Sequence, residues 1–235
     1  MLLKVRIVGV KLTNGMEKMP DIELNVLEQT NILRIKSLLT KEQCMDISKQ
    51  IIEYKNTNNP ADVRGNKHAN PGCWMGKPHF NNGFTKDTEL LLIDTIRTAC
   101  QMYYECQPNP LNISRTMYGP LTKASWDMWP WVNVNDIGSE NREHTHLGDR
   151  PYMCGVLYLQ SQGTGRIEFM PYNYTYKQVH AEWPYNGVAY YEPDDGDVLM
   201  FPPYLLHRVE RNNGNQQRIT MAFNARTEQN RTPNA

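Results

Sequence analysis

Three histidines and one arginine supply the residue types from which a metal site with an anionic ligand can be built. His144 and His146 stand two positions apart, and His207 and Arg218 follow later in the chain. Side chains at i and i+2 of an extended segment share a face, so both imidazoles can face one ion. His207 would complete a three-ligand face that leaves positions open for substrate and oxygen. Arg218 would aim its planar fork at a carboxylate near that ion, in a bidentate way that lysine cannot reproduce.

Two strands are expected to position this site. The segment from Gly196 to Pro203 is predicted to be a strand that delivers His207 to its end, with Arg218 paired across a hairpin from it. Residues after Arg218 alternate, so that one face is apolar and the other contains the arginine. If the second face lines a barrel, Arg218 is buried and needs an anion. On a surface edge it would be an ordinary strand-end arginine.

Two helices are predicted in the first half of the chain. The first begins after Thr40, which forms a capping box with Gln43, and should end before Asn56. The second spans Asp87 to Glu105, where apolar residues recur at helical spacing. Residues 57–86 are rich in Asn, Gly and Pro and are expected to form a long loop.

Short strands separated by turn residues are predicted in the second half. They lie around Leu111–Met117, Trp131–Val134, Cys154–Gln160, Arg166–Met170, Val188–Tyr191, Asp197–Phe201 and Arg218–Asn224, after an N-terminal strand within residues 1–12. Helices followed by many strands indicate a mainly β protein with supporting helices (α+β), with the strands in a sandwich or jelly roll. We expect one compact domain, in which residues 1–110 buttress a jelly-roll core over residues 111–228.

Composition narrows the class of partner. The 25 basic and 25 acidic residues give a formal net charge of zero, which argues against a nucleic-acid-binding surface. A small molecule or a peptide is the expected partner. Five cysteines without a CxxC spacing predict reduced thiols and an intracellular location. No apolar run approaches the ~18 residues of a membrane span, so we expect a soluble, cytoplasmic protein without a membrane partner.

The second half of the chain resembles the 2-oxoglutarate- and Fe(II)-dependent oxygenases, and more narrowly their prolyl-hydroxylase-like branch from bacteria and bacteriophages. The motifs that carry the resemblance are Trp131-Val-Asn-Val-Asn, His144-Thr-His, Gly155-Val-Leu-Tyr-Leu, Gly165-Arg-Ile-Glu-Phe, Gly196-Asp-Val-Leu-Met-Phe-Pro with His207, Arg218-Ile-Thr and Phe223-Asn. The resemblance implies a double-stranded β-helix, which is a jelly roll. It also implies Fe(II) and 2-oxoglutarate as cofactors and O2 as co-substrate.

Carried over by position, the resemblance implies that His144 is the first metal ligand and His207 the last. Arg218 would anchor the distal carboxylate of 2-oxoglutarate, assisted by the Thr220 hydroxyl and the Tyr158 phenol. The departure is at the middle ligand, where His146 replaces the usual carboxylate. That replacement removes one negative charge from the site.

Asp149 is the alternative middle ligand. It would supply a carboxylate if the strand ends early and Leu147-Gly148 turns back. The spacing favours His146, so the predicted metal ligands are His144, His146 and His207.

The sequence thus predicts a 2-oxoglutarate- and Fe(II)-dependent dioxygenase that hydroxylates a peptide or small molecule, with peptidyl proline suggested by the resemblance alone. Two alternatives stay open: a cupin-like three-histidine metalloenzyme without 2-oxoglutarate, and a non-enzymatic jelly-roll binding or structural protein. The aromatic segment 172–191 is interpreted either as a lid over the site or as a packed hairpin. Trp126, Trp129 and Trp131 are expected to pack in the core and at its rim.

Overall fold

The structure is a computed structural model, which describes residues 3–6, 22–27, 30–57, 72–77, 83–106, 122–147, 151–170 and 189–227. Within these ranges the α-helices are α1 (Lys41–Thr57) and α2 (Lys86–Glu105), and a short 3-10 helix, η2, spans Lys123–Ser125. The strands are β1 (Leu3–Arg6), β2 (Ile22–Leu27), β3 (Thr30–Ile35), β4 (Cys73–Gly76), β5 (Trp126–Asn135), β6 (Asn141–His144), β7 (Met153–Gln160), β8 (Ile167–Phe169), β9 (Ala189–Tyr191), β10 (Val198–Phe201), β11 (His207–Val209) and β12 (Arg218–Thr227). None of these helices is long and apolar enough to cross a membrane.

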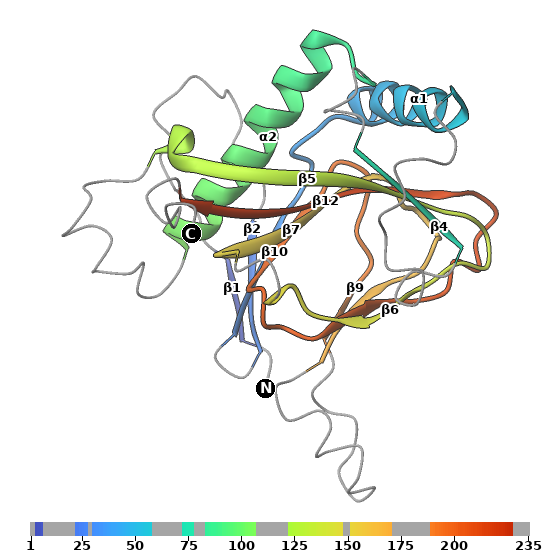
Figure 1. Ribbon diagram of the computed structural model, residues 1–235. Coiled ribbons are helices and arrows are strands. Elements are labelled where there is room, and N and C mark those ends of the chain that lie inside the picture. Colours follow the sequence, from blue (N-terminus) through green and yellow to red (C-terminus); the bar gives the residue numbers. More distant parts are fainter. Residues whose placement is uncertain are drawn as a thin grey trace, which may run out of the picture.

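The strands form two facing sheets. The larger sheet has the order β1-β2-β3-β10-β7-β12-β5-β4, and the smaller one has the order β6-β11-β8-β9. Both helices lie on one side of the larger sheet, while β6 and β9 lie on its other side (Figure 1). The protein therefore has the mainly β, double-stranded β-helix architecture that the sequence predicted.

The two faces of β12 show that the larger sheet packs against a different set of residues on each side. Ile219, Met221 and Phe223 are buried in a cluster that contains the residues of both helices. Arg218 and Thr220 alternate with these residues and so face the smaller sheet. A second apolar cluster fills the space between the sheets, and we call this side of the larger sheet the inner face.

Both predicted helices are present, with small differences at their ends. The capping box at α1 is confirmed, because the Thr40 amide donates to Gln43 Oε1 at 2.8 Å and the Gln43 amide donates to Thr40 Oγ1 at 3.2 Å. The predicted end before Asn56 is wrong, since α1 continues to Thr57. There the Thr57 hydroxyl donates to the Glu53 carbonyl at 2.9 Å, which satisfies an acceptor of the last turn.

Two strand predictions need correction. The predicted loop over residues 57–86 contains β4, which pairs with β5. Strand β5 is ten residues long and begins at Trp126 rather than Trp131. Pro130 is tolerated inside it because β4 pairs only with Val132 to Asn135, and Pro130 lies beyond that ladder. The strand predicted at Leu111–Met117 lies outside the described residues.

The N-terminal part of the chain contributes strands as well as helices. Strand β3 pairs with β10, so β1, β2 and β3 extend the larger sheet beyond the strands of the second half of the sequence. The predicted strand near the N-terminus is present as β1, whereas β2 and β3 were not predicted. The division into a buttress over 1–110 and a core over 111–228 stays a prediction.

The predicted hairpin between His207 and Arg218 is wrong. His207 does not end the strand that begins after Gly196. It begins β11, which pairs with β6 and β8 in the smaller sheet. Arg218 begins β12, which pairs with β5 and β7 in the larger sheet. The two residues therefore reach the space between the sheets from opposite sides.

Gly155 in β7 is required by close packing across three strands. A Cβ at this position would clash with Phe223 of β12 and Met200 of β10, both of which are fully buried. We expect Gly155→Ala to lower the free energy of unfolding by about 1–3 kcal/mol, the usual cost of overpacking a core. Urea denaturation of both proteins measures this change, and an unaltered midpoint would contradict the packing described here.

Candidate metal and anion site

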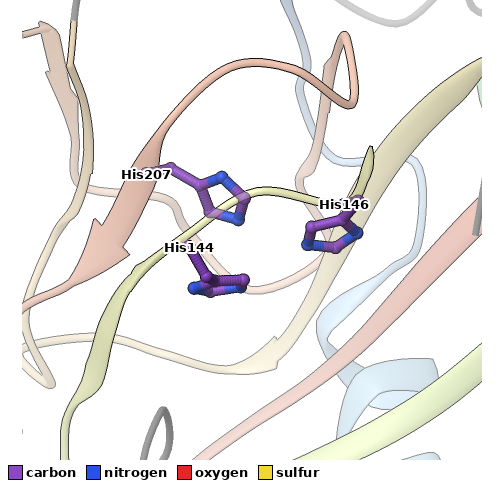
Figure 2. A group of neighbouring side chains, drawn as sticks. All are labelled: His144, His146 and His207. Atoms are coloured by element: carbon purple, nitrogen blue, oxygen red, sulfur yellow. The ribbon is translucent and has the colours of Figure 1, made fainter. Parts of the chain in front are cut away.

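Three imidazoles converge between the sheets. The nitrogen ligand atoms of His144, His146 and His207 all lie within 4.8 Å of one another (Figure 2). The ring centroids are 4.3 Å apart for His144 and His207 and 5.1 Å apart for His146 and His207. This spacing lets three side chains contact one ion. The structure therefore brings the three predicted ligand residues together.

A β-bulge aims the first histidine at the cluster. His144 pairs with His207, whereas Asn141 pairs with Val209, so β6 carries one residue more than β11 between these pairs. Bulges of this kind bend a strand and redirect its side chains. Strand β6 then ends at His144, and the His146 amide donates to the Pro203 carbonyl at 2.9 Å.

Hydrogen bonds at Nδ1 fix the histidine tautomers. Nδ1 of His144 lies 2.7 Å from the Arg142 carbonyl, and Nδ1 of His207 lies 2.9 Å from the Leu205 carbonyl. Because a carbonyl only accepts, Nδ1 must carry the proton in both rings, and the lone pair stays on Nε2. In metal proteins a ligating histidine usually donates its other ring N–H in this way. The donor set therefore fits a metal ion bound through Nε2.

Burial favours the neutral form of His207 and of His144. The pKa of His207 is held well below its usual value by burial, and the neighbouring His144 and His146 lower it further. Burial also lowers the pKa of His144. Metal ligation requires unprotonated imidazole, so the pocket favours the form that binds a metal ion.

Arg218 is a buried cation without an acidic partner in the described part of the chain. Its side chain is 2% exposed, and burial lowers the pKa of the guanidinium. Nη1 donates to the Thr164 carbonyl at 2.7 Å, and Nη2 donates to Asn141 Oδ1 at 3.4 Å. These acceptors are neutral. The carboxylate of Glu210 also acts on the Arg218 charge, but it forms its ion pair with Arg166, at 2.6 Å. Burying a charge is costly unless it is paired, which makes this position suited to an anionic ligand.

Thr220 and Tyr158 lie on the same inner face as Arg218. They are directly opposite each other in the β12–β7 pairing, and both are buried. Burial raises the pKa of the Tyr158 phenol, while the nearby Arg218 opposes that rise. The phenol therefore stays protonated and can donate a hydrogen bond. The structure places both residues beside Arg218, where the resemblance implied a carboxylate.

Several sequence-based interpretations concern residues outside those described. Asp149, the alternative middle ligand, is among them, and so is most of the aromatic segment 172–191. Trp126 is fully buried against the helices and is a core residue, as predicted. Trp131 is only partly buried, and its ring centroid lies 5.8 Å from that of His146.

Two asparagines belong to the site although the sequence did not indicate a role for them. Asn141 Oδ1 accepts from Asn135 Nδ2 at 3.1 Å and also contacts Arg218. Asn224 Oδ1 lies 2.6 Å from Nδ1 of His146. The alternation that begins at Arg218 places position 224 on the inner face, so this pattern would have identified Asn224 as a candidate. Nothing comparable in the sequence pointed to Asn141.

The fold and the site together define a double-stranded β-helix protein with a three-histidine cluster and a buried arginine between its sheets. Residues 129–224 match the protein family described as "Putative 2OG-Fe(II) oxygenase". That range includes the three histidines of the cluster and, at the anion position, Arg218, Thr220 and Tyr158. The match and the cluster support the expected cofactors, Fe(II) and 2-oxoglutarate with O2. No curated protein matched the sequence.

Solved structures share the fold at low sequence identity. A prolyl hydroxylase from Trichoplax adhaerens, in complex with a hypoxia inducible factor peptide fragment, has a TM-score of 0.57 and 13% identity, with 84% of each chain covered. A Pseudomonas putida prolyl-4-hydroxylase has a TM-score of 0.50 and 15% identity, covering 84% of this chain and 92% of that one. HygX from Streptomyces hygroscopicus, with nickel, 2-oxoglutarate and hygromycin B bound, has a TM-score of 0.50 and 15% identity, covering 85% and 84%. These likenesses show the shared fold.

Proposed function

We propose that this protein is an Fe(II)- and 2-oxoglutarate-dependent dioxygenase that hydroxylates its substrate. His144, His146 and His207 would hold the iron, and Arg218 would hold the distal carboxylate of 2-oxoglutarate. The observation that carries the proposal is the burial of Arg218 on the inner face of the larger sheet, which also faces the histidine cluster. The Arg218 guanidinium forms no ion pair with a carboxylate of the described residues. When bound, the iron would supply the activation of O2 that is coupled to oxidation of 2-oxoglutarate and substrate.

The chain's own contribution to this chemistry is to bind, orient and exclude water. Nδ1–H donation orients the imidazoles, so each presents Nε2 to the same space. Arg218 and the protonated Tyr158 phenol would fix the far end of the co-substrate by charge-assisted hydrogen bonds. A co-substrate held at both ends enters the reaction already positioned, which lowers the entropic part of the barrier.

Arg218 also favours this proposal over the two alternatives. A cupin-like three-histidine enzyme without 2-oxoglutarate needs no buried cation on the inner face. A non-enzymatic jelly-roll protein needs neither the cation nor three histidines whose Nδ1 atoms are all held. Neither alternative explains why a guanidinium is buried at this position without an ion pair to any of the described residues.

Exposed apolar side chains at the rim of the site favour a substrate with an apolar ring or chain. Leu147 is 58% exposed and Tyr204 is 49% exposed. The hydrogen bond from the His146 amide to the Pro203 carbonyl joins their two loops beside the cluster. Trp131 adds a partly exposed ring next to His146. A peptidyl proline suits such a rim, and we infer it as the substrate, in a prolyl-hydroxylase-like enzyme of the bacterial or bacteriophage type.

Thermal unfolding with Mn(II), with and without 2-oxoglutarate, tests the proposal. Mn(II) should raise the melting temperature, and 2-oxoglutarate should raise it further only when the metal is present, because each ligand stabilises the folded state it binds. A rise with metal and none with 2-oxoglutarate would favour the cupin-like alternative. The absence of any rise would favour a non-enzymatic protein.

Turnover gives the second part of the same test. With Fe(II), O2 and 2-oxoglutarate, the protein should form succinate, and proline-containing peptides should increase the rate. Oxidised proline in the peptide would establish the substrate. If no proline peptide changes the rate of succinate formation, the dioxygenase assignment stands and the prolyl substrate is wrong.

A further inference from the structure

We propose that Asn224 is a positioning residue that sets the orientation and tautomer of His146. This inference rests on the proposed metal site and adds a residue to it. Asn224 is 1% exposed, and its Oδ1 lies 2.6 Å from Nδ1 of His146. With Nδ1–H donating to the amide oxygen, the Nε2 lone pair of His146 faces the other two histidines.

The three histidines differ in what holds them. His144 and His207 each donate to the backbone carbonyl of the residue two positions earlier, Arg142 and Leu205 respectively. Those acceptors belong to the same local segment and do not depend on any side chain. His146 instead relies on a side chain that is 78 positions away in the sequence. The Nδ1 hydrogen bond of His146 is therefore one that a side-chain substitution can remove.

Strand β12 ties this support to the anion position. Arg218, Thr220 and Asn224 share one face of the same strand, because side chains at even spacing point the same way. Their pairing with β5 and β7 fixes the register of that face on both sides. Strand β12 thus carries both Arg218, the proposed partner of the 2-oxoglutarate carboxylate, and Asn224, which supports His146. The two residues are six positions apart on the same strand.

The amide also has a chemical consequence. An amide oxygen is a neutral acceptor, so Asn224 places no negative charge behind the His146 ring. A carboxylate in its place would draw the Nδ1 proton more strongly and make Nε2 a better donor to the metal. The usual carboxylate at the middle metal-ligand position is absent here, because that position is His146. Asn224→Asp would place a negative charge behind His146 instead of directly on the metal. The proposal therefore predicts opposite effects for two substitutions at one position.

Cobalt(II) is the probe for the experiment, because it reports both affinity and ring protons. In the Co(II)-loaded wild type, proton NMR should show paramagnetically shifted, solvent-exchangeable imidazole N–H signals from the three histidines. Asn224→Ala should lose one of these signals to exchange and should bind Co(II) about 10–100-fold more weakly, the usual cost of removing such an outer partner. Asn224→Asp should keep all the signals and bind Co(II) at least as tightly as wild type.

Asn212→Ala is the matched control, because Asn212 is also a buried amide but supports a turn. Its Nδ2 donates to the Gln216 carbonyl at 2.8 Å and to the Asn135 carbonyl at 3.3 Å, and Asn212 is not the Nδ1 partner of any of the three histidines. This variant should lose stability while its Co(II) affinity stays that of wild type. A uniform loss of metal affinity in Asn212→Ala and Asn224→Ala would assign Asn224 a purely structural role.

The outcomes separate the inference from the function on which it rests. If Asn224→Ala retains the full set of N–H signals and the wild-type affinity, the inference is wrong and the metal site stands. If the wild type binds no Co(II), the proposed function fails first. Should Asn224→Ala not fold, the isosteric Asn224→Asp still decides, because weaker binding or a lost signal in that variant contradicts the proposal.

Discussion

Replacing His207 by alanine is expected to abolish stoichiometric Mn(II) binding. Removing a group that only orients a ligand costs about 10–100-fold in metal affinity, so removing the ligand itself should cost more than ~100-fold. His207 lies at the centre of the cluster, within contact distance of both other rings, and is 3% exposed. Calorimetric titration of Mn(II) into wild type, His207→Ala and His144→Ala measures the change. His68→Ala, at a histidine with no assigned role, should bind Mn(II) like wild type.

The same titration decides the middle ligand. We expect His146→Ala to lose most of the affinity and Asp149→Ala to keep most of it, since His146 meets the other two rings. If Asp149→Ala proves as damaging as His144→Ala while His146→Ala is mild, the ligand set is His144, Asp149 and His207. The all-histidine assignment would then be wrong, and with it the argument that the site lacks one negative charge.

Arg218→Ala is expected to weaken 2-oxoglutarate binding at least ~30-fold. When one partner of a desolvated guanidinium–carboxylate pair is truncated, the binding free energy weakens by about 2–5 kcal/mol. Because ~1.4 kcal/mol corresponds to tenfold in a binding constant, even the lower limit gives a large effect. Mn(II) affinity should barely change, since Arg218 is not a metal ligand. Anaerobic titration of 2-oxoglutarate into the Mn(II)-loaded proteins measures the difference.

Arg218→Lys provides the matched comparison. A lysine keeps the charge but cannot present two parallel N–H donors, so it should recover only part of the lost affinity. Full recovery would mean that charge alone matters at this position. Unchanged affinity in Arg218→Ala, or no binding of 2-oxoglutarate to the wild type, would remove the 2-oxoglutarate assignment and leave the cupin-like alternative.

Periodicity predicted the elements whose pattern is local. Alternation after Arg218 placed its side chain on the face opposite Ile219 and Met221. In the structure, Ile219 and Met221 are buried in the cluster that contains the helices, and Arg218 is buried outside that cluster. The capping residues Thr40 and Gln43 located the start of α1 to the residue. Short-range hydrogen bonds and side-chain alternation are encoded within a few positions, so a single sequence reveals them.

Pairing partners were beyond the reach of the sequence. Nothing in the residues around His207 and Arg218 shows that the chain crosses from one sheet to the other between them, so a hairpin was the simplest expectation. Strand β4 was missed because its four residues lie within a stretch rich in Gly, Pro and Asn, and it becomes a strand only by pairing with β5. The support of His146 by Asn224 joins residues from distant segments and required three-dimensional placement.

The most direct test of the central claim is the visible absorption spectrum of the anaerobic protein with Fe(II) and 2-oxoglutarate. A charge-transfer band appears only when the 2-oxo acid chelates iron, so one spectrum reports the metal site and the co-substrate together. We expect this band in the wild type at one iron per chain, its loss in His207→Ala, and a much higher 2-oxoglutarate requirement in Arg218→Ala. Stoichiometric Fe(II) binding without any band at saturating 2-oxoglutarate would contradict the claim that the three histidines and Arg218 form one site.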